Sequence, residues 1–503
     1  MALQHITKII LFIGGGFLFN FLFWDETLGI NLILYTTFLV ILGGITQREV
    51  FRSKSLWISM GGILVTGTLF LINHSFVAGL IHVISVFVYI GFLCEPNIRA
   101  LYGSLVAAVL NAIDLPKSIT YELFHHHKNY DKLRKRLRLL KLIIIPTVIF
   151  WIFYMIFYAS NPVFQKYSDS MWNFISEAFT AIFEDISFLW IMTLIFGMSL
   201  VGLVIFRSRR KSFSTYESKL SDDIQRKKRG KNKVFIFRTP GMVSLKNEYK
   251  SALFLTASIN CLLLIVNLID IQWIWFNFEY DGVMNLSQLV HEGTYLLILS
   301  ILLSMGILLY FFRRNLNFLQ NNVWLKRLAI AWIVQNAVLV VSVIIRNYHY
   351  MYHFGLAYKR IGVMFFLSAV IVGLITLYIK INKAKTSYYL LRVNSWAVYG
   401  LLLILSCVNW DVVIVKHNIK YTSERNLDVE FLLSLSDKTL PILHKNRDKL
   451  NLEGYNAYTS TSNDITLDSR IRYLMEDKNT FSWKSWNYAD TKVFKYFEST
   501  DYK

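Results

Sequence analysis

The chain has 503 residues, of which 54% are hydrophobic and 16% aromatic, and its formal net charge is +20. These fractions are high for a soluble protein and ordinary for a polytopic membrane protein. The charge does not indicate nucleic-acid binding, because residues 416–503 carry 14 basic and 13 acidic residues. Nearly all of the excess lies in the apolar part of the chain, where no nucleic-acid-binding motif accompanies it.

Apolar segments long enough to cross a bilayer follow one another from the N-terminus to about residue 415. A spanning helix needs about 20 mostly apolar residues, since backbone polar groups find no partners in hydrocarbon outside the helix. The candidate spans are residues 8–24, 28–46, 56–73, 76–95, 139–160, 186–206, 251–271, 294–312, 327–346, 362–380 and 394–415. The predicted fold class is therefore all-α, a polytopic transmembrane helix bundle of about 11 spans.

Two further segments are predicted helices that do not cross. Residues 163–183 carry an apolar stripe that includes Phe174 and Phe179, which indicates an interfacial helix on the outer leaflet. Residues 99–115 are short and interrupted, which favours a re-entrant or cytoplasmic surface helix. Whether this second segment enters the membrane stays open at the level of the sequence.

Residues 416–503 differ from the rest, because apolar runs end and Ser, Thr, Asn, Asp and Tyr take over. We expect a small helical domain outside the membrane, which buries too little core to stand alone. The predicted domains are 1–138 (N-terminal membrane helices and a basic cytoplasmic segment), 139–415 (the remaining spans) and 416–503 (the extracytoplasmic helical domain).

Lysine and arginine gather in alternate loops, above all in 117–141 and 207–250, whereas the loops between them hold mostly acids. Positively charged loops stay cytoplasmic, so we predict a cytoplasmic N-terminus, and the odd number of spans places the C-terminus outside. One outside loop, 346–361, is an exception, because it holds Arg346, Lys359 and Arg360 and no acid.

The partners follow from this distribution. The 207–250 loop has 14 basic and 4 acidic residues, which indicates attraction to anionic lipid headgroups at the cytoplasmic face, worth about 1 kcal/mol per residue. An acidic protein partner at this loop is the alternative. The C-terminal domain is a second candidate surface for a protein partner, and no nucleic acid is expected.

The sequence contains no complete catalytic motif: no glycine-rich phosphate loop, no G-x-S-x-G, no H-E-x-x-H and no C-x-x-C. His349 and His353 share a helical face, as zinc ligands do, but no carboxylate lies near them in sequence. Residues 125–127 are consecutive histidines in a basic segment, and His82 is expected to be a hydrogen-bonded core residue. We predict no catalytic residue, no metal and no cofactor.

Polar side chains within spans are better functional candidates, because they must pair or line a cavity. They are Asn267 and Asp270 in the seventh span, Gln335 and Asn336 in the ninth, and Asn409 and Asp411 at the end of the last. Hydrogen bonding between helices explains them most simply. A polar cavity for a substrate is the alternative.

Six short motifs occur in order from residue 139 onward. They lie at Ala159–Phe164, Leu286–Gly293, Arg346–Arg360, Asn409–Asn418, Asp428–Pro441 and Trp483–Asn487. On these motifs the chain resembles an uncharacterised family of bacterial membrane proteins, domain of unknown function 4173, with the related 4153 group. Asn161 and Phe354 depart from the family pattern. The resemblance implies a multi-pass protein of the bacterial inner membrane and supplies no activity, substrate or catalytic residue.

The third motif explains the basic outside loop. Its matching positions are Arg346, Tyr350, Gly355 and Arg360. Arginine forms bidentate pairs with carboxylates, so we expect its two arginines to bind an acidic group of the C-terminal domain. Asp428 and Glu430 are the candidate acceptors, and lipid headgroups or simple solvation are the alternatives.

The leading functional hypothesis is a non-enzymatic scaffold or sensor-like partner in the cell envelope. A transporter or lipid flippase is the second hypothesis, favoured by the polar residues within spans. An envelope glycosyl- or acyltransferase is the third, for which Asp270 and Asp411 are the carboxylates near enough to a membrane surface.

Overall fold

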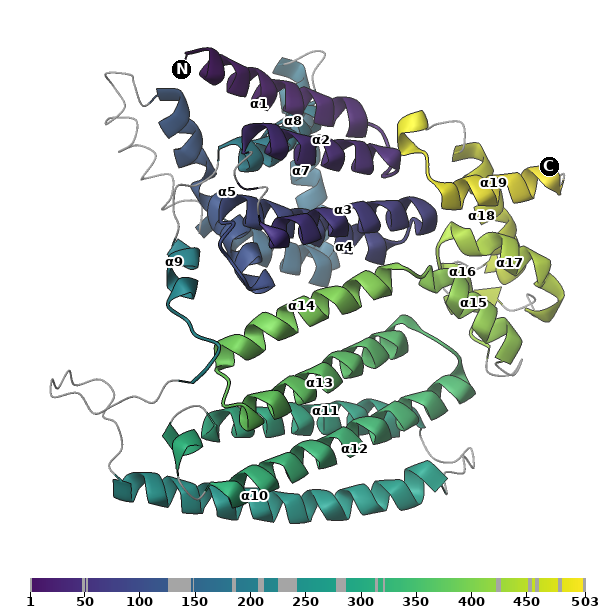
Figure 1. Ribbon diagram of the computed structural model, residues 1–503. Helices are drawn as coiled ribbons and strands as arrows, with labels where there is room; N and C mark the ends of the chain where they lie inside the picture. Colours follow the sequence, from purple (N-terminus) through teal and green to yellow (C-terminus); the bar gives the residue numbers. More distant parts are fainter. Residues whose placement is uncertain are drawn as a thin grey trace. The chain divides into compact units, whose positions relative to one another are not determined.

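Figure 1 shows the computed structural model, which describes residues 2–47, 50, 53–124, 146–147, 149–182, 187–206, 212–224, 242–276, 286–312, 315–319, 322–421, 427–450, 455–456, 461–477 and 482–500. Helices account for nearly all of the described residues, so the all-α class is confirmed. The described exception is one antiparallel pair of two-residue strands, β1 (Tyr455–Asn456) and β2 (Thr461–Ser462).

The chain divides into two compact units, Met1–Glu217 with Met475–Phe494 and Ser218–Leu474 with Lys495–Lys503. The α-helices of the first unit are α1 (Ala2–Phe23), α2 (Ile30–Thr46), α3 (Lys54–Asn73), α4 (Phe76–Cys94), α5 (Leu101–Phe124), α7 (Pro162–Ile182), α8 (Phe188–Ile205) and α9 (Ser212–Ser218), with most of α19 (Tyr488–Ser499). Those of the second unit are α10 (Met242–Asp270), α11 (Leu286–Phe311), α12 (Val323–Phe354), α13 (Tyr358–Asn382), α14 (Ser387–Ser406), α15 (Trp410–Tyr421), α16 (Val429–Ser434), α17 (Leu440–Lys445) and most of α18 (Asn463–Asp477). The three-domain division of the sequence stays a prediction.

In the first unit, small residues bring α1 and α8 together. Val201 lies against Gly15 and Phe19 lies against Gly197, so closely that a Cβ at either glycine would collide. The Asn20 amide donates to the Trp190 carbonyl at 2.9 Å. Such close backbone approach is how membrane helices gain van der Waals contact when lipid removes the hydrophobic driving force between them.

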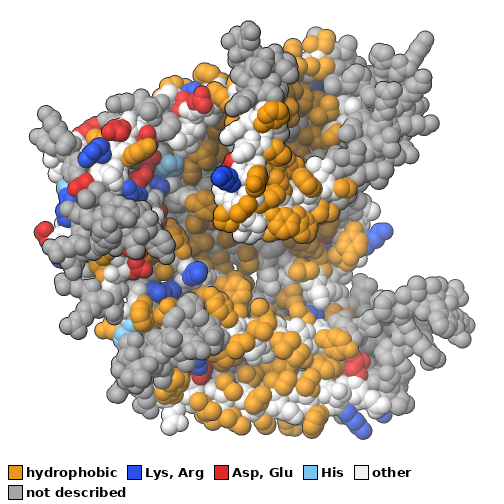
Figure 2. Space-filling model, turned by 180° about the vertical axis from the view of Figure 1, so that it is seen from behind, with side chains coloured by type: hydrophobic (Ala, Val, Ile, Leu, Met, Phe, Trp, Pro, Cys, Tyr) orange, Lys and Arg blue, Asp and Glu red, His pale blue; other side chains and the backbone are white. Residues whose placement is uncertain are grey.

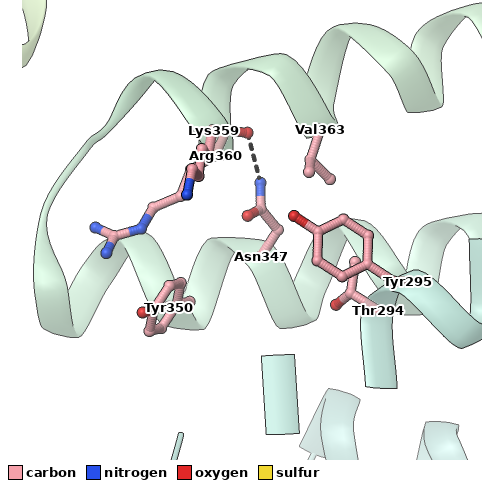
Figure 3. A pocket seen from close by; sticks show the side chains of 7 residues that line it. All are labelled: Thr294, Tyr295, Asn347, Tyr350, Lys359, Arg360 and Val363. Atoms are coloured by element: carbon pink, nitrogen blue, oxygen red, sulfur yellow. Dashed lines mark hydrogen bonds between the residues drawn. The ribbon is translucent and has the colours of Figure 1, made fainter. Parts of the chain in front are cut away.

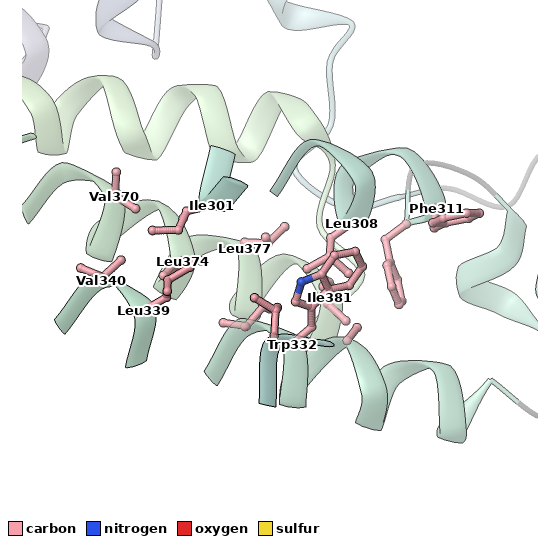
Figure 4. Packing of buried hydrophobic residues seen from close by; sticks show 14 of the residues in the cluster. Ile301, Leu308, Phe311, Trp332, Leu339, Val340, Val370, Leu374, Leu377 and Ile381 are labelled. Atoms are coloured by element: carbon pink, nitrogen blue, oxygen red, sulfur yellow. The ribbon is translucent and has the colours of Figure 1, made fainter. Parts of the chain in front are cut away.

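In the second unit, α10 to α13 enclose a core of buried aliphatic side chains around Trp332 (Figure 4). Trp332 lies on α12 and is fully buried, with Leu308 of α11 and Leu377 and Ile381 of α13 in the same cluster. Buried polar residues of the same helices, among them Asn267, Asn336 and Lys380, lie beside this apolar cluster.

Every predicted span overlaps an apolar helix, although residues 139–145 of the fifth span lie outside the described residues. Nine described helices are long and apolar enough to cross a membrane: Ile6–Phe23, Lys54–Asn73, Phe76–Cys94, Phe188–Ile205, Lys246–Phe276, Thr294–Phe311, Val323–Phe354, Tyr358–Asn382 and Ser387–Ser406. Two shorter apolar helices, Ile30–Thr46 and Ile149–Ser160, match the remaining two predictions. The chain is a multi-pass membrane protein.

The exposed helix faces are apolar, as contact with lipid requires. Figure 2 shows hydrophobic side chains over much of the visible surface. On α10, for example, the side chains of Leu262, Ile265 and Ile269 are all more than half exposed. Water-soluble proteins rarely expose apolar patches of this extent, so these faces contact the bilayer.

The predicted last span, 394–415, is wrong at its C-terminal end, since α14 ends at Ser406 and a new helix, α15, begins at Trp410. Asn409 accounts for the break, because its Oδ1 accepts a hydrogen bond from the Val412 backbone N–H at 3.4 Å and so caps α15. The apolar run that follows Trp410 conceals this break in the hydropathy pattern.

The segment predicted at 99–115 is helical and extends further, as α5. Figure 1 shows α5 crossing the ends of neighbouring helices of its unit. Its Asn111 amide donates to the Leu203 carbonyl of α8 at 2.9 Å, and Glu122 near its end pairs with Lys8 of α1. These contacts lie at one end of α1 and α8, which supports the surface-helix interpretation.

The helix predicted at 163–183 is confirmed as α7. The Asn161 side chain caps it, and α7 then folds back on the preceding helix, where the rings of Trp151 and Trp172 stack at 5.9 Å. The Trp172 indole N–H donates to the Tyr154 hydroxyl at 2.7 Å. Its position on the outer leaflet stays a prediction, and the Phe179 side chain lies outside those that the structure describes.

Candidate functional site

The helices α10 and α12 run parallel and share a seam of hydrogen bonds. The Gln335 amide donates to Asn260 Oδ1 at 2.9 Å, and the Asn267 amide donates to the Gln335 carbonyl at 3.1 Å. Further along, the Trp275 indole N–H donates to Ser342 Oγ at 3.0 Å. Because Asn260 and Asn267 are seven residues apart, as are Gln335 and Ser342, both helices keep the same faces together along the seam.

Asp270 and Arg346 form a buried ion pair within this seam. Their side chains are 6% and 10% exposed, and Asp270 Oδ1 lies 2.5 Å from an Arg346 terminal nitrogen. Asp270 Oδ2 and Arg346 Nε have no partner among the described residues. In a bidentate arginine–carboxylate pair, these two atoms form the second hydrogen bond.

The expected pairing of Arg346 with the C-terminal domain is therefore wrong. The reason is that Asp270, on the neighbouring helix, satisfies the guanidinium inside the bundle. Asp428 has a different role, because its carboxylate accepts from the Phe431 backbone N–H at 2.9 Å and caps α16.

Several buried polar atoms of the same bundle lack partners among the described residues. They are the side-chain oxygens of Asn267, Gln335 and Asn336 and the indole nitrogen of Trp332. The Asn336 amide donates to the Trp332 carbonyl at 2.8 Å, one turn away. An unsatisfied buried polar group costs about 1–3 kcal/mol, so these positions favour ordered water or a polar ligand between the helices.

The turn between α12 and α13 gathers the other residues of the third motif. Gly355 has φ 73° and ψ −176°, a conformation that residues with a Cβ rarely adopt. Arg360 donates to the Phe354 carbonyl at 2.7 Å and to the Gly355 carbonyl, and its guanidinium lies 4.2 Å above the Tyr350 ring. Arg360 therefore binds the carbonyl end of α12, rather than a C-terminal acid as expected.

The fourth motif binds this same turn. The Asn418 side chain of α15 accepts from the Leu356 backbone N–H at 2.6 Å and donates to the Leu356 carbonyl at 3.0 Å. Asp411 accepts hydrogen bonds from the hydroxyls of Tyr358 and Ser436. Two motifs that are some 60 residues apart thus form one structure, and Ser436 ties the C-terminal segment to it.

A second cluster, in the first unit, binds the last motif to the loop between α1 and α2. The Glu26 carboxylate accepts from the hydroxyls of Ser482 and Ser485, both at 2.5 Å, and lies 3.0 Å from the Lys484 ammonium. The Ile30 backbone N–H also donates to the Trp486 carbonyl at 2.9 Å. We call Glu26, Ser482, Lys484 and Ser485 the Glu26 cluster.

The electrostatics of the Glu26 cluster favour the ionised carboxylate. Partial burial raises the pKa of Glu26, but the hydrogen bonds from Ser482, Ser485 and Lys484 and the charge of Lys484 outweigh it and lower the pKa to about 2. Glu26 is therefore ionised across the physiological pH range.

The described residues contain no group of three His, Cys, Asp or Glu side chains placed to hold a metal. His349 is within 3.3 Å of the Ile274 carbonyl. His82 lies between Thr66 (2.9 Å) and Thr36 (3.3 Å), as expected of a core histidine. Residues 125–127 lie outside the described residues.

Sequence reasoning missed three polar anchors. Glu26 entered the topology prediction only as one of the acidic residues in the outside loops. Lys380, which is fully buried, donates to the Phe312 and Lys385 carbonyls at 3.1 and 2.9 Å. Glu217 accepts from the backbone N–H of Arg99 at 2.7 Å. Each of the three binds at least one partner far away in sequence, which no local pattern signals.

A model of the family described as Domain of unknown function (DUF4153) matches residues 30–446. This is the 4153 group named above as related, and the match includes residues 30–138, which precede the six motifs on which the resemblance was based. No curated protein and no solved structure matches the chain.

Proposed function

The chain belongs to the family described as Domain of unknown function (DUF4153), and we propose that it is a non-enzymatic membrane scaffold or sensor-like partner in the cell envelope. The observation that carries this proposal is the Glu26 cluster, which holds the final motif of the chain on a loop between two membrane helices. A helical region attached in this way is suited to present a fixed surface to a partner protein. The finer likeness to the 4173 family also remains a proposal.

We place the C-terminus outside the cytoplasm of a bacterium and the N-terminus inside. In the first unit, the segment that contains Glu26's partners also brings Asp490 within 3.1 Å of His74, in another loop predicted to lie outside. In the second unit, Asn418 binds Leu356, again in a loop predicted to lie outside. In each unit, a loop predicted to lie outside thus contacts a part of the chain that follows the last predicted span.

The basic loop, 207–250, contacts segments that are predicted, like the loop itself, to lie on the cytoplasmic side. Glu217 binds Arg99 in the first unit. In the second, Asp222 lies 2.7 Å from Arg392 and Asp223 lies 2.5 Å from Lys385. This grouping supports a cytoplasmic location for the loop. Its basic run at 226–229 lies outside the described residues, and by its charge it is suited to attract anionic headgroups or an acidic partner.

Reporter fusions test the sidedness on which the proposal depends. A reporter active only outside the cytoplasm, fused after Lys503, is expected to be active. The same reporter fused near Gly230 is expected to be silent. The reverse pattern would contradict the topology and the envelope-facing role together.

A transporter is the second candidate, and the unpartnered oxygens of Asn267, Gln335 and Asn336 favour it. A cysteine at position 335 that reacts with a water-soluble reagent would indicate an aqueous cavity. The transferase hypothesis has the least support, because Asp270 is paired with Arg346 and Asp411 is held by two hydroxyls.

A further inference from the structure

A small pocket lies between the ends of α11, α12 and α13 in the second unit. Figure 3 shows Thr294 and Tyr295 on α11 across from Asn347 and Tyr350 on α12, with Arg360 above them on α13. The pocket holds about 20 Å³, enough for one water-sized group, and it is partly open.

Thr294 supplies an unused hydrogen-bonding group to this pocket. Its residue is 3% exposed, and its Oγ1 has no hydrogen-bond partner among the described residues. A buried threonine within a helix ordinarily donates to the carbonyl one turn before it, as Thr256 does to Ala252 at 2.7 Å. Thr294 therefore retains a hydroxyl for a group that enters the pocket.

Positive charge gathers at the mouth of the pocket. Lys359 and Arg360 line it and lie in the first turn of α13, whose N-cap residue, Ala357, has no side chain that can cap it. The helix dipole makes this end positive as well, so a cation in the first turn is unfavourable unless a negative group offsets it. The carbonyls of residues 354 and 355 offset Arg360, whereas Lys359 has no such group among the described residues. The carboxylate of Asp411, which accepts from Tyr358 at the start of α13, also accepts from Ser436 and does not line the pocket.

The donors of Arg360 and Asn347 that lie beside the pocket are bonded to backbone carbonyls, so no carboxylate of the described residues is bound at the site. One terminal nitrogen of Arg360 is bound to the carbonyls of residues 354 and 355, and the Asn347 amide donates to the Arg360 carbonyl at 3.0 Å. These bonds fix the walls of the pocket. Lys359 is exposed and has no ion pair among the described residues.

We propose that this pocket binds the phosphate group of an anionic ligand. One phosphate oxygen fills the cavity and accepts from Thr294 Oγ1, while the remaining oxygens meet the Lys359 ammonium and the N-terminal end of α13. The chemistry fits a phospholipid headgroup or a free phosphate. The inference deepens the sensor-like half of the proposed function, because Tyr358, adjacent to the site, is bonded to Asp411 and through it to Ser436.

The test measures phosphate-dependent binding to the full-length protein. Native mass spectrometry compares phosphatidylglycerol with diacylglycerol, which has the same acyl chains and no phosphate. The unmodified protein is expected to prefer phosphatidylglycerol. Thr294→Val, which keeps the shape and removes the hydroxyl, is expected to weaken this binding about tenfold, as loss of one hydrogen bond to a charged group does.

Matched variants separate the site from general effects. Thr256→Val changes a buried threonine of α10 and is expected to leave binding unchanged. Lys359→Gln is expected to weaken binding, whereas Lys326→Gln, in the first turn of α12, is not. Melting temperatures close to that of the unmodified protein confirm that each variant is folded.

Inorganic phosphate distinguishes the two sources of the ligand. If it displaces phosphatidylglycerol, the site takes free phosphate; if it does not, the site is specific for a lipid headgroup. Equal binding of phosphatidylglycerol and diacylglycerol, or full binding by Thr294→Val, would overturn the proposal. Neither result concerns the Glu26 cluster, so the proposed scaffold role is tested separately, by the reporter fusions.

Discussion

A carboxylate meets a cation in each compact unit, but the surroundings differ. Asp270 pairs with Arg346 inside the helix bundle, where both side chains are almost fully buried. Glu26 meets Lys484 in a loop, where two serine hydroxyls share the carboxylate. In the bundle each charged side chain is neutralised by one partner, whereas in the loop several hydrogen-bond donors stabilise the carboxylate together. The same chemistry thus stabilises the helix bundle in one unit and attaches the C-terminal segment to a loop in the other.

Breaking the buried pair is expected to have the largest effect. Arg346→Met leaves Asp270 charged and unpaired in an apolar bundle, which costs about 3–5 kcal/mol of stability. The double variant Asp270→Leu/Arg346→Met removes both charges and is expected to recover most of this loss. Thermal unfolding in detergent measures both. A double variant as unstable as the single one would show that the pair is not the source of the loss.

The Glu26 cluster is expected to respond to pH instead. Its folded-state pKa of about 2 lies below the ordinary value of 4.5, so its stabilisation is complete above pH 4.5 and is lost as the pH falls from 4.5 towards 2. A spin label at Tyr488, which is exposed, is expected to gain mobility over this range. Glu26→Gln is expected to abolish this pH dependence, and a retained transition would assign it to another group.

The turn between α12 and α13 gives a smaller effect of a different kind. Gly355→Ala places a Cβ at φ 73° and ψ −176°, which costs about 1–3 kcal/mol. Gly362→Ala is the matched control, because nothing lies within 4 Å of its added Cβ in helix α13 and alanine favours a helix. Melting temperatures that fall equally in both variants would contradict a special conformation at Gly355.

The smallest effect is expected at the ion pair between Lys385 and Asp223, whose carboxylate side chain is 66% exposed. Water competes for both charges, and exposed pairs often contribute nothing measurable. Lys385→Gln is therefore expected to leave the melting temperature unchanged. A fall in melting temperature comparable with that of Arg346→Met would mean that solvent exposure does not determine how much an ion pair contributes to stability.

Hydropathy was sufficient to predict the helices, because a span must satisfy its own backbone and its apolar length is visible in the sequence. It failed at Asn409, where a cap divides a continuous apolar run. It also could not reveal how α7 folds back on the preceding helix, since that depends on pairs such as Trp151 with Trp172.

The sequence predicted which residues belong to the candidate site, but it did not predict which of them pair with one another. Asp270 was selected as a polar group within a span and Arg346 as a basic residue of the outside loop at a motif position, but 76 residues separate them, and no local spacing joins them. We assigned Arg346 to an acid of the C-terminal domain because both lay on one predicted side of the membrane. The packing of α10 against α12, which only tertiary structure shows, decides the partner instead.

The Glu26 cluster attaches the C-terminal segment to the loop between α1 and α2. Hydrogen–deuterium exchange of residues 482–500, measured for the full-length protein in reconstituted membranes, tests it most directly. Glu26→Gln is expected to speed exchange in this segment, whereas Asp25→Asn, which alters the neighbouring acid of the same loop, is not. Exchange at the unmodified rate in Glu26→Gln would contradict the account.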